Sequence, residues 1–514
     1  MAKVLFINPV MREEDDPRHV PYGIALLAAI AVRDGHQVQV YDHNAWRPSN
    51  TVVAQVLQAD DWDVVALGGI TTAYRSIKQI VAMAGELAPK ALVVAGGGFL
   101  TSMPHDIMRF LPQVEVGTVG EAFVSFPEIL RRVDAGNRDW GAVPGLIWRD
   151  ASGKTTLNRE QPLLMDLDSL PYPAWELFPL EVYFKNSMAL FSEEGMMARR
   201  RLDINASYGC SLICRFCFHL GIAGDMQHKE NERGENDVAF TYDRKIRYHS
   251  PRYIVELVKY ARQRFGVDFI GFLDENLMTM HQFSGKTWLT DIARLWIEEG
   301  LQPQCVRDDV PHDPEKCTGV HWGGTSHATL CSPEVLRAIK QSGCSHLVYG
   351  YESFSKRVMK TIGKGATPET NERSLKWTLE AGIRPIPNQM MGFPDEDFDS
   401  LKDNIHAWNR LGLNVKPFFA TPYPGTEWYY TNKQRILEQY DGDLEAFLLD
   451  LGDATRVTAV ICKKFNAVEL YGLRELMVLR DIGRIERYEK EWNRLHAGDP
   501  PPKPAPHLIL ETTR

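Results

Sequence analysis

Three of the eight cysteines fall in one short segment, YGCSLICRFCFH. Three residues separate Cys210 from Cys214, and two residues separate Cys214 from Cys217. Three thiolates on one tight loop can bind three irons of a cubane cluster, which leaves the fourth iron open for another ligand. The spacing therefore favours a [4Fe-4S] cluster held by Cys210, Cys214 and Cys217.

Zinc is the main competing interpretation of this segment. Structural zinc sites usually have four ligands, mostly in paired C-x2-4-C units. No second pair follows at a suitable spacing, and His219, which could supply a fourth ligand, stands almost beside Cys217. A segment that binds no metal is the third alternative.

The remaining cysteines and the histidines give weaker signals. Cys305, Cys317, Cys331 and Cys344 could hold a second cluster, but their spacings are irregular, and a buried thiol is the default interpretation for each. Cys305 and Cys317 are the better candidates for chemistry because they lie in an insertion at 302–320. Five histidines are each more typical of structural or solvated positions: His228, His249, His312, His321 and His327.

Composition and charge exclude several classes of protein. The 514 residues are 44% hydrophobic and 24% charged, which is typical of a folded globular chain. The net charge of −9 argues against nucleic-acid binding across the whole surface. The longest apolar run, 22–32, is too short for a transmembrane segment, and the N-terminus turns acidic where a signal peptide would need its cleavage site. We therefore expect a cytoplasmic protein whose clustered cysteines bind metal rather than form disulfides.

The first 140 residues alternate between strand and helix patterns. Short apolar runs that end in glycine or polar residues predict parallel strands, and amphipathic stretches between them predict helices. The order predicts an α/β, flavodoxin-like (Rossmann-type) sheet, which binds ligands beyond the carboxyl ends of its strands. The expected strands are 3–9, 36–42, 63–69, 91–98 and 114–122.

Three further regions follow. A connector rich in Pro and aromatic residues is expected at 141–200, and a helical C-terminal domain at 431–514. Between them, at 201–430, six strand–helix units predict a partial (β/α)6 barrel with its chemistry at the carboxyl ends of the strands. The expected strands are 204–209, 269–275, 320–326, 346–353, 383–393 and 415–424.

The cysteine motif, CxxxCxΦC after a first barrel strand, resembles the signature of radical S-adenosylmethionine (radical SAM) enzymes. The segments FLDEN, GYESFSKRVMKTIGKG, NQMMGFPDED and FATPYPGTEWY are similar to later strand segments of that family. The resemblance implies that the open iron binds SAM and that one electron cleaves SAM to a 5′-deoxyadenosyl radical. The residues that it assigns to the cofactors are Phe216, Asp274, Glu275, Glu352, Ser353, Gly392 and Glu396.

Each of these assignments has a structural alternative. Glu352 could be a buried carboxylate paired with a barrel Lys or Arg. Asp274 and Glu275 lie where the family segment is loose, and Gly392 could only shape a turn.

A flavodoxin-like domain, a DSLPYPAWE connector and then the barrel resemble the cobalamin-binding class of radical SAM enzymes. The resemblance places Gly96, Gly97 and Gly98 against the corrin or its nucleotide tail. The other cobalamin contacts that it implies are Thr71, Thr72 and Tyr74 under the lower face and Gly120 and Glu121 in the last loop.

The chain departs from that class in two places. It reads GEAF where the family often reads GEGE, and it lacks the Asp-x-His-x-x-Gly motif that supplies a histidine to cobalt elsewhere, since Asp16 and His19 are three positions apart. We therefore expect no histidine on cobalt. The alternatives are a plain strand-to-helix turn at the glycine run and a degenerate domain that binds no cobalamin.

The resemblance implies a cobalamin-dependent radical SAM methyltransferase that acts on an unactivated carbon, with a low-potential electron donor such as flavodoxin or ferredoxin. A cyclase or other radical oxidoreductase that transfers no methyl group is the alternative, and a non-catalytic cobalamin or iron–sulfur sensor is a third class. The substrate is expected to be a small molecule. The C-terminal helices would cover the barrel mouth, and their apolar segments FLLDL and ELMVL would suit a hydrophobic substrate or a packed core equally.

Overall fold

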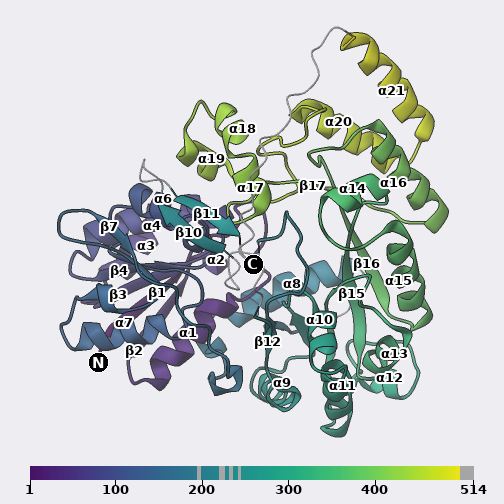
Figure 1. The fold of residues 1–514 in the computed structure, drawn as a ribbon. Coiled ribbons are helices and arrows are strands. Elements are labelled where there is room, and N and C mark those ends of the chain that lie inside the picture. The colour runs from purple at the N-terminus through teal and green to yellow at the C-terminus, as the bar shows by residue number, and fades with distance from the viewer. Residues whose placement is uncertain (194–197, 219–225, 231–235, 241–244, 498–514) are drawn as a thin grey trace.

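The computed structural model describes residues 1–193, 198–218, 226–230, 236–240 and 245–497 (Figure 1). Its N-terminal part is a sheet in the order β2-β1-β3-β4-β5-β6-β7, in which the first five strands run parallel. That order is the flavodoxin-like one, as expected. These five strands are β1 (Lys3–Asn8), β2 (Gln37–Asp42), β3 (Val64–Gly68), β4 (Leu92–Gly96) and β5 (Val116–Thr118).

Helices cover both faces of this sheet because the strands between them are apolar on both faces. On one face α1 (Tyr22–Arg33) contacts α7 (Ser125–Asp134), and on the other α3 (Asn50–Leu57) contacts α4 (Tyr74–Leu87). Three shorter helices are α2 (His43–Trp46), α5 (Gly98–Ser102) and α6 (Pro104–Phe110).

Two antiparallel strands extend the sheet beyond β5. They are β6 (Leu146–Arg149) and β7 (Thr155–Leu157), and both lie within the stretch expected to be a connector. The sequence pattern did not indicate them, because each is only three or four residues long. The domain boundaries proposed from the sequence stay predictions. Helix α8 (Leu180–Glu193) then leads to the second sheet.

The second sheet is a curled half-barrel in the order β17-β16-β15-β14-β13-β8, with every neighbouring pair parallel. Six strands were expected here and six are present among the described residues, but the first is Arg201–Ile204 rather than 204–209, and Ser207–Tyr208 pairs outside this sheet. They are β8 (Arg201–Ile204), β13 (Phe269–Phe272), β14 (His321–Ser326), β15 (Cys344–Glu352), β16 (Arg384–Met391) and β17 (Phe418–Phe419). Its helices are α9 (Pro251–Phe265), α10 (Leu277–Phe283), α11 (Trp288–Glu298), α12 (Gln304–Arg307), α13 (Pro333–Gln341), α14 (Lys356–Thr361), α15 (Pro368–Glu380) and α16 (Phe398–Leu411).

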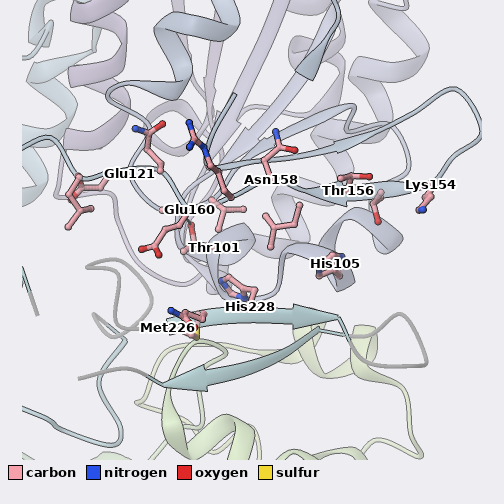
Figure 2. A pocket seen from close by; sticks show the side chains of 18 residues that line it. Thr101, His105, Glu121, Lys154, Thr156, Asn158, Glu160, Met226 and His228 are labelled. Carbon is pink, nitrogen blue, oxygen red and sulfur yellow. Dashed lines mark hydrogen bonds between the residues drawn. The ribbon is translucent and has the colours of Figure 1, made fainter. Parts of the chain in front are cut away.

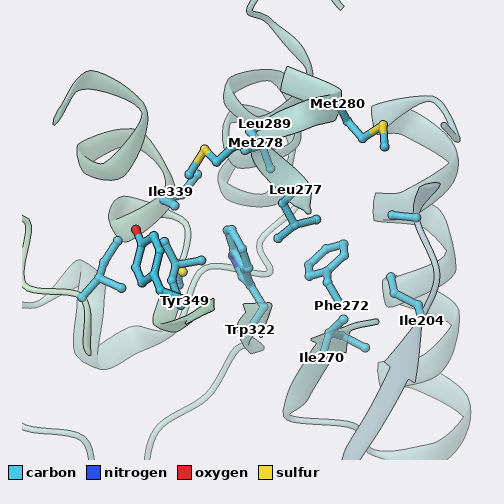
Figure 3. Close-up of a cluster of buried hydrophobic side chains, with 14 of the residues drawn as sticks. Ile204, Ile270, Phe272, Leu277, Met278, Met280, Leu289, Trp322, Ile339 and Tyr349 are labelled. Carbon is cyan, nitrogen blue, oxygen red and sulfur yellow. The ribbon is translucent and has the colours of Figure 1, made fainter. Parts of the chain in front are cut away.

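The half-barrel is held by a large aromatic and aliphatic core between its strands and helices (Figure 3). Phe272, Trp322 and Tyr349 come from three neighbouring strands, and the rings of Phe272 and Trp322 are 5.3 Å apart between centroids. Burial of such side chains contributes about 1.5–3 kcal/mol each. This core fixes the strand ends from which the site is built.

Two short antiparallel pairs lie outside these sheets. Strand β12 (Arg247–Tyr248) pairs with β9 (Ser207–Tyr208), and β10 (Met226–Glu230) forms a hairpin with β11 (Asn236–Phe240). The hairpin contacts α6 of the N-terminal domain and lies beside it in Figure 1.

The C-terminal helices divide between the two bodies. The first group packs in the core of the N-terminal domain, where Phe447 and Leu448 are buried. The second group packs on α16, with Leu473 and Met477 buried in the barrel core. The apolar segments FLLDL and ELMVL therefore contribute Phe447, Leu448 and Met477 to cores, whereas Val478 and Leu479 are exposed. The helices are α17 (Glu427–Thr431), α18 (Lys433–Glu438), α19 (Leu444–Asp450), α20 (Ala467–Val478) and α21 (Ile482–Leu495).

Over the described part of the chain, every helix falls short of the length and apolarity that crossing a membrane requires.

Candidate active site

The cysteine loop follows the first barrel strand and is anchored by Asp274 from the second. The Asp274 carboxylate accepts a hydrogen bond from the backbone N–H of Ala206, at 3.1 Å, and another from the hydroxyl of Ser207. Burial raises the pKa of Asp274 to about 7. Asp274 therefore joins the carboxyl ends of β8 and β13, directly before the segment that contains Cys210.

The three cysteines lie close enough for their charges to interact. Cys210 and Cys214 are buried and Cys217 is half-buried. Burial raises the pKa of the Cys210 and Cys214 thiols, the other cysteines raise it further, and Lys364 opposes the rise at Cys214. The negative charge of Glu275 also raises the pKa of Cys210. His219, the possible fourth ligand in the competing zinc interpretation of this loop, lies outside the described residues.

The three loop cysteines do not form a compact single-ion group among the described residues. A single ion brings all of its ligand atoms close together. Among the described residues, one group of His, Cys, Asp or Glu has its ligand atoms all within 4.8 Å of one another, and that group does not include the three cysteines. The donor set of three thiols therefore fits a multi-iron cluster.

Glu352 forms a buried ion pair at the end of the fourth barrel strand. Its carboxylate lies 2.6 Å from Nζ of Lys364, and both side chains are 8% exposed. Burial alone would lower the pKa of Lys364, but Glu352 and then the cysteine thiols outweigh it and raise the pKa. A buried pair with a barrel Lys or Arg is the structural alternative expected for Glu352, although the sequence alone did not identify Lys364 as the partner. The signal for Lys364 was its place in TIGKG, inside the family segment.

The backbone at Glu352 is strained. Its φ is +57°, which is a left-handed conformation that glutamate rarely adopts, and β15 carries an irregularity between Gly350 and Glu352. Such conformations cost of order 1–3 kcal/mol and cluster at functional sites. In this conformation the Glu352 carboxylate contacts Lys364, and its charge raises the pKa of Cys214.

The other predicted SAM residues shape the neighbouring turns. The hydroxyl of Ser353 donates to Oδ1 of Asn404 at 3.1 Å and accepts from the N–H of Ser355 at 3.0 Å. The N–H of Gly392, which has φ of +82°, donates to the Glu396 carboxylate. Ser353, Gly392 and Glu396 therefore each have a hydrogen bond within the protein.

Phe216 packs rather than pointing into open space. Its ring centroid lies 5.4 Å from that of Trp428, in a small core with Phe393. This contact ties the cysteine loop to the segment after β17.

Several buried polar atoms at this end of the barrel have no hydrogen-bond partner in the structure: Oγ of Ser326, Nε2 of His327 and Oε1 of Glu396. Burial lowers the pKa of His327 to about 3 and raises that of Glu396 to about 8, so both side chains are neutral near pH 7. Buried polar groups nearly always have partners in folded proteins. A polar ligand such as SAM fits this requirement.

Two glycines of the predicted cobalamin site are explained by backbone packing. A Cβ on Gly96 would lie 2.4 Å from Oγ1 of Thr118. A Cβ on Gly97, where φ is +90°, would lie 2.8 Å from the carbonyl oxygen of Gly69. Both are needed for the strand ends to approach one another, whatever ligand is bound.

Gly98 behaves differently, because it faces the cysteine loop. A Cβ on Gly98 would lie 2.6 Å from Cζ of Phe218, the residue directly after Cys217. The same ring lies against Gly425, where a Cβ would come 2.9 Å from Cε2. The strand ends of the N-terminal sheet and the cysteine loop therefore meet at Phe218.

Some of the remaining predicted cobalamin residues have hydrogen-bond or ion-pair partners within the chain, and others do not. The Tyr74 hydroxyl donates to Oε1 of Glu445 at 2.6 Å, and the Glu121 carboxylate forms a buried ion pair with Arg247. Both of these side chains join separate parts of the chain. In contrast, the buried Oγ1 of Thr72 has no partner in the structure, and Gly120 has φ of +83° with nothing within 4 Å of a Cβ position. Thr71 is buried on the same turn.

A cavity of about 660 Å³ opens beside Gly120 and Glu121 (Figure 2). Thr101 and His105 reach it from the N-terminal domain, and the hairpin carries Met226 and His228 to its other side. Thr71, Thr72, Tyr74 and the glycines at 96–98 do not line it. The cavity and the Gly98–Phe218 contact are therefore two parts of the surface at this edge of the sheet.

Profiles of two known families match the chain. The B12 binding domain matches residues 10–130, and the Radical SAM superfamily matches residues 204–407. An uncharacterized methyltransferase of Pyrococcus horikoshii is 26% identical over 419 residues, which cover 81% of this chain and 79% of the relative. An anaerobic magnesium-protoporphyrin IX monomethyl ester cyclase of Rubrivivax gelatinosus is 22% identical, over 82% of this chain and 68% of the cyclase.

A solved structure shares the fold. The radical S-adenosylmethionine methyltransferase TsrM of Kitasatospora setae is 16% identical, with a TM-score of 0.63 over 84% of this chain and 76% of TsrM.

The two profile matches identify the cofactors. A radical SAM domain uses a [4Fe-4S] cluster and SAM, and a B12 binding domain uses cobalamin. The unpartnered polar atoms and the three thiols fit those groups. This chain is an enzyme, and it belongs to the cobalamin-dependent radical SAM family.

Proposed function

We propose that this enzyme methylates an unactivated carbon of a small-molecule substrate. When bound, the cluster supplies the electron that cleaves SAM to a 5′-deoxyadenosyl radical, and cobalamin carries the methyl group. The observation that carries the proposal is the contact of Phe218 with Gly98, because it sets the cysteine loop against the strand ends of the B12 binding domain. A substrate between the two would meet both cofactors.

The chain's own residues then have separate tasks. Cys210, Cys214 and Cys217 hold the cluster. Ser326, His327 and Glu396 offer the polar atoms that bind SAM, and neutral His327 and Glu396 do so without adding charge beside the cluster.

Other side chains position rather than bind. Asp274 fixes the start of the cysteine loop, and Lys364 holds Glu352 beside the thiols. On the cobalamin side, Thr72 and Gly120 would face the cofactor, Gly98 contacts the cysteine loop, and Tyr74 and Glu121 hold the surrounding elements together.

A cyclase or oxidoreductase that transfers no methyl group is the second candidate. It is favoured by the similarity to the Rubrivivax gelatinosus cyclase, which extends over 82% of this chain. A low-potential electron donor such as flavodoxin or ferredoxin and a cytoplasmic location are part of both proposals.

The test is anaerobic reconstitution with iron, sulfide and hydroxocobalamin, followed by reduction with titanium citrate in the presence of SAM. Products are measured by mass spectrometry. S-adenosylhomocysteine and 5′-deoxyadenosine together support methyl transfer. 5′-Deoxyadenosine without S-adenosylhomocysteine favours the cyclase or oxidoreductase, and absence of both contradicts a catalytic role and favours the sensor.

A further inference from the structure

A second group of cysteines and histidines lies at the opposite end of the half-barrel from the cysteine loop. Cys305 on α12, His312 and Cys317 in the following loop, and His321 at the start of β14 have ligand atoms that all lie within 4.8 Å of one another. We propose that these four side chains form a structural zinc site with tetrahedral Cys2His2 coordination.

The distances match those around one ion. Sγ of Cys305 lies 3.5 Å from Nδ1 of His312 and 3.4 Å from Nε2 of His321. In tetrahedral zinc, with Zn–S of about 2.3 Å and Zn–N of about 2.0–2.1 Å, sulfur and nitrogen ligands stand about 3.5 Å apart. The centroids of the two imidazole rings lie 4.6 Å apart, and the ring planes are at 80° to each other.

The backbone hydrogen bonds of the group are those of a zinc site. Nδ1 of His321 lies 3.3 Å from the carbonyl oxygen of Gly343, and because a carbonyl only accepts, this nitrogen carries the proton. Nε2 is then left with its lone pair toward Cys305, as a metal ligand requires. The backbone N–H of Cys305 donates to Sγ of Cys317 at 3.3 Å, which suits a thiolate ligand.

The loop that brings the ligands together is fixed by its own backbone. The N–H of Gln304 donates to the carbonyl of Thr318, and the N–H of Val320 to that of Leu301, each at 2.8 Å. The chain crosses itself at Gly319, where φ is +103° and a Cβ would lie 2.5 Å from the carbonyl oxygen of Gln302. This crossing places Cys317 beside Cys305, and only glycine allows it.

The location favours a structural rather than a catalytic metal. His321 is the first residue of its strand, so the group lies at the amino ends of the barrel strands, where barrel proteins place stability rather than chemistry. Four protein ligands also leave no open position for a substrate. The metal would bind the insertion at 302–320 to the start of β14.

Zinc is chosen over an iron–sulfur cluster by the compactness of the group. A cluster of two irons would divide two cysteines and two histidines between separate metals, whereas here both histidine nitrogens lie next to the same cysteine sulfur. A tetrahedral set of two cysteines and two histidines around one ion is a standard structural zinc site.

The test measures metal content of the full chain, purified without oxygen from zinc-supplemented cells and reconstituted with iron and sulfide. We expect about one zinc and about four irons per chain in the wild type. The C305S/C317S variant should lose at least 80% of its zinc and keep its iron. The matched control C331S, which changes a buried cysteine of the same domain outside the group, should keep both metals.

Three outcomes overturn the proposal: zinc that persists in C305S/C317S, iron that falls there in place of zinc, or a wild type that contains no zinc and has a Cys305–Cys317 disulfide. If C305S/C317S does not fold, Co2+ added to a chain with all three loop cysteines replaced by alanine decides the question. Intense visible bands of tetrahedral Co2+, with a thiolate charge-transfer band, support the site, and the weak bands of octahedral Co2+ overturn it.

Discussion

The two ends of the half-barrel differ in how their buried polar side chains are satisfied. At the carboxyl ends of the strands, Ser326, His327 and Glu396 have buried polar atoms without partners, and Glu352 is held in a strained conformation. At the amino ends, the proposed zinc ligands face one another, and the remaining ring nitrogen of His321 is bonded to Gly343. The carboxyl end has polar atoms that a ligand could satisfy, whereas the polar groups of the amino end contact one another.

This difference separates two uses of the same residue types. In the proposed cluster site, the three cysteines at the carboxyl ends would leave a coordination position open, and a buried cation, Lys364, lies within electrostatic range of Cys214. Cysteines at the amino ends are joined by histidines that would complete the coordination. On these two proposals, the carboxyl end would serve the reaction and the amino end would serve stability.

Cys214→Ala gives the largest expected effect and tests whether the two cysteine groups are independent. Removing one of three thiolates should abolish the brown cluster absorbance and all formation of 5′-deoxyadenosine, while the zinc content stays unchanged. Absorbance, product analysis and metal analysis check these three expectations. C331S is the matched control, and SAM cleavage that persists in Cys214→Ala would remove the triad from the cluster site.

Lys364→Met should destabilise the carboxyl end without touching the amino end. It leaves Glu352 as a buried charge without its partner, which typically costs about 3–5 kcal/mol in the free energy of unfolding. Anaerobic urea unfolding of the cofactor-free chain measures this loss. Lys360→Met, an exposed position on α14, is the matched control.

A second variant separates the pair from simple loss of packing. E352Q/K364M removes both charges, so it should recover part of the lost stability while it weakens SAM binding. A loss below about 1 kcal/mol in Lys364→Met would mean that the pair does not form in solution.

The parts that could be predicted from the sequence were local. The three loop cysteines stand within eight residues, and most parallel strands of both sheets are short apolar runs. Both features can be recognised from neighbouring residues alone. The proposed zinc ligands span 17 positions, from 305 to 321, at irregular spacings. They come together only because the chain crosses itself at Gly319.

The predicted residues that proved to be engaged elsewhere share the same cause. Tyr74 bonds to Glu445, which is 371 positions away, and Glu121 pairs with Arg247, which is 126 positions away. A motif assigns such a residue to a cofactor because the sequence does not show what packs beside it. Gly98 lies against Phe218, which is far away in the sequence. The pattern of residues around Gly98 therefore could not indicate this contact.

Glu396→Gln gives the smallest expected effect. It tests whether burial keeps the Glu396 carboxyl group protonated in the cofactor-free chain. Burial raises the pKa of Glu396 from 4.5 to about 8. The folded chain therefore binds this proton more tightly than the unfolded chain does. The resulting stability is fully present below about pH 4.5 and is lost as the pH rises to about 8, at about 1.4 kcal/mol per pH unit.

Between pH 6 and pH 8 the wild type should therefore lose about 2–3 kcal/mol that the glutamine variant keeps, because glutamine does not titrate. Urea unfolding of the cofactor-free chain at the two pH values measures the difference, with the exposed Glu86→Gln on α4 as the control that should behave like the wild type. An equal loss in the wild type and Glu396→Gln would mean that Glu396 is already ionised or hydrated in the absence of SAM. The carboxyl end would then be as complete as the amino end, and the contrast between them would have to rest on the metals alone.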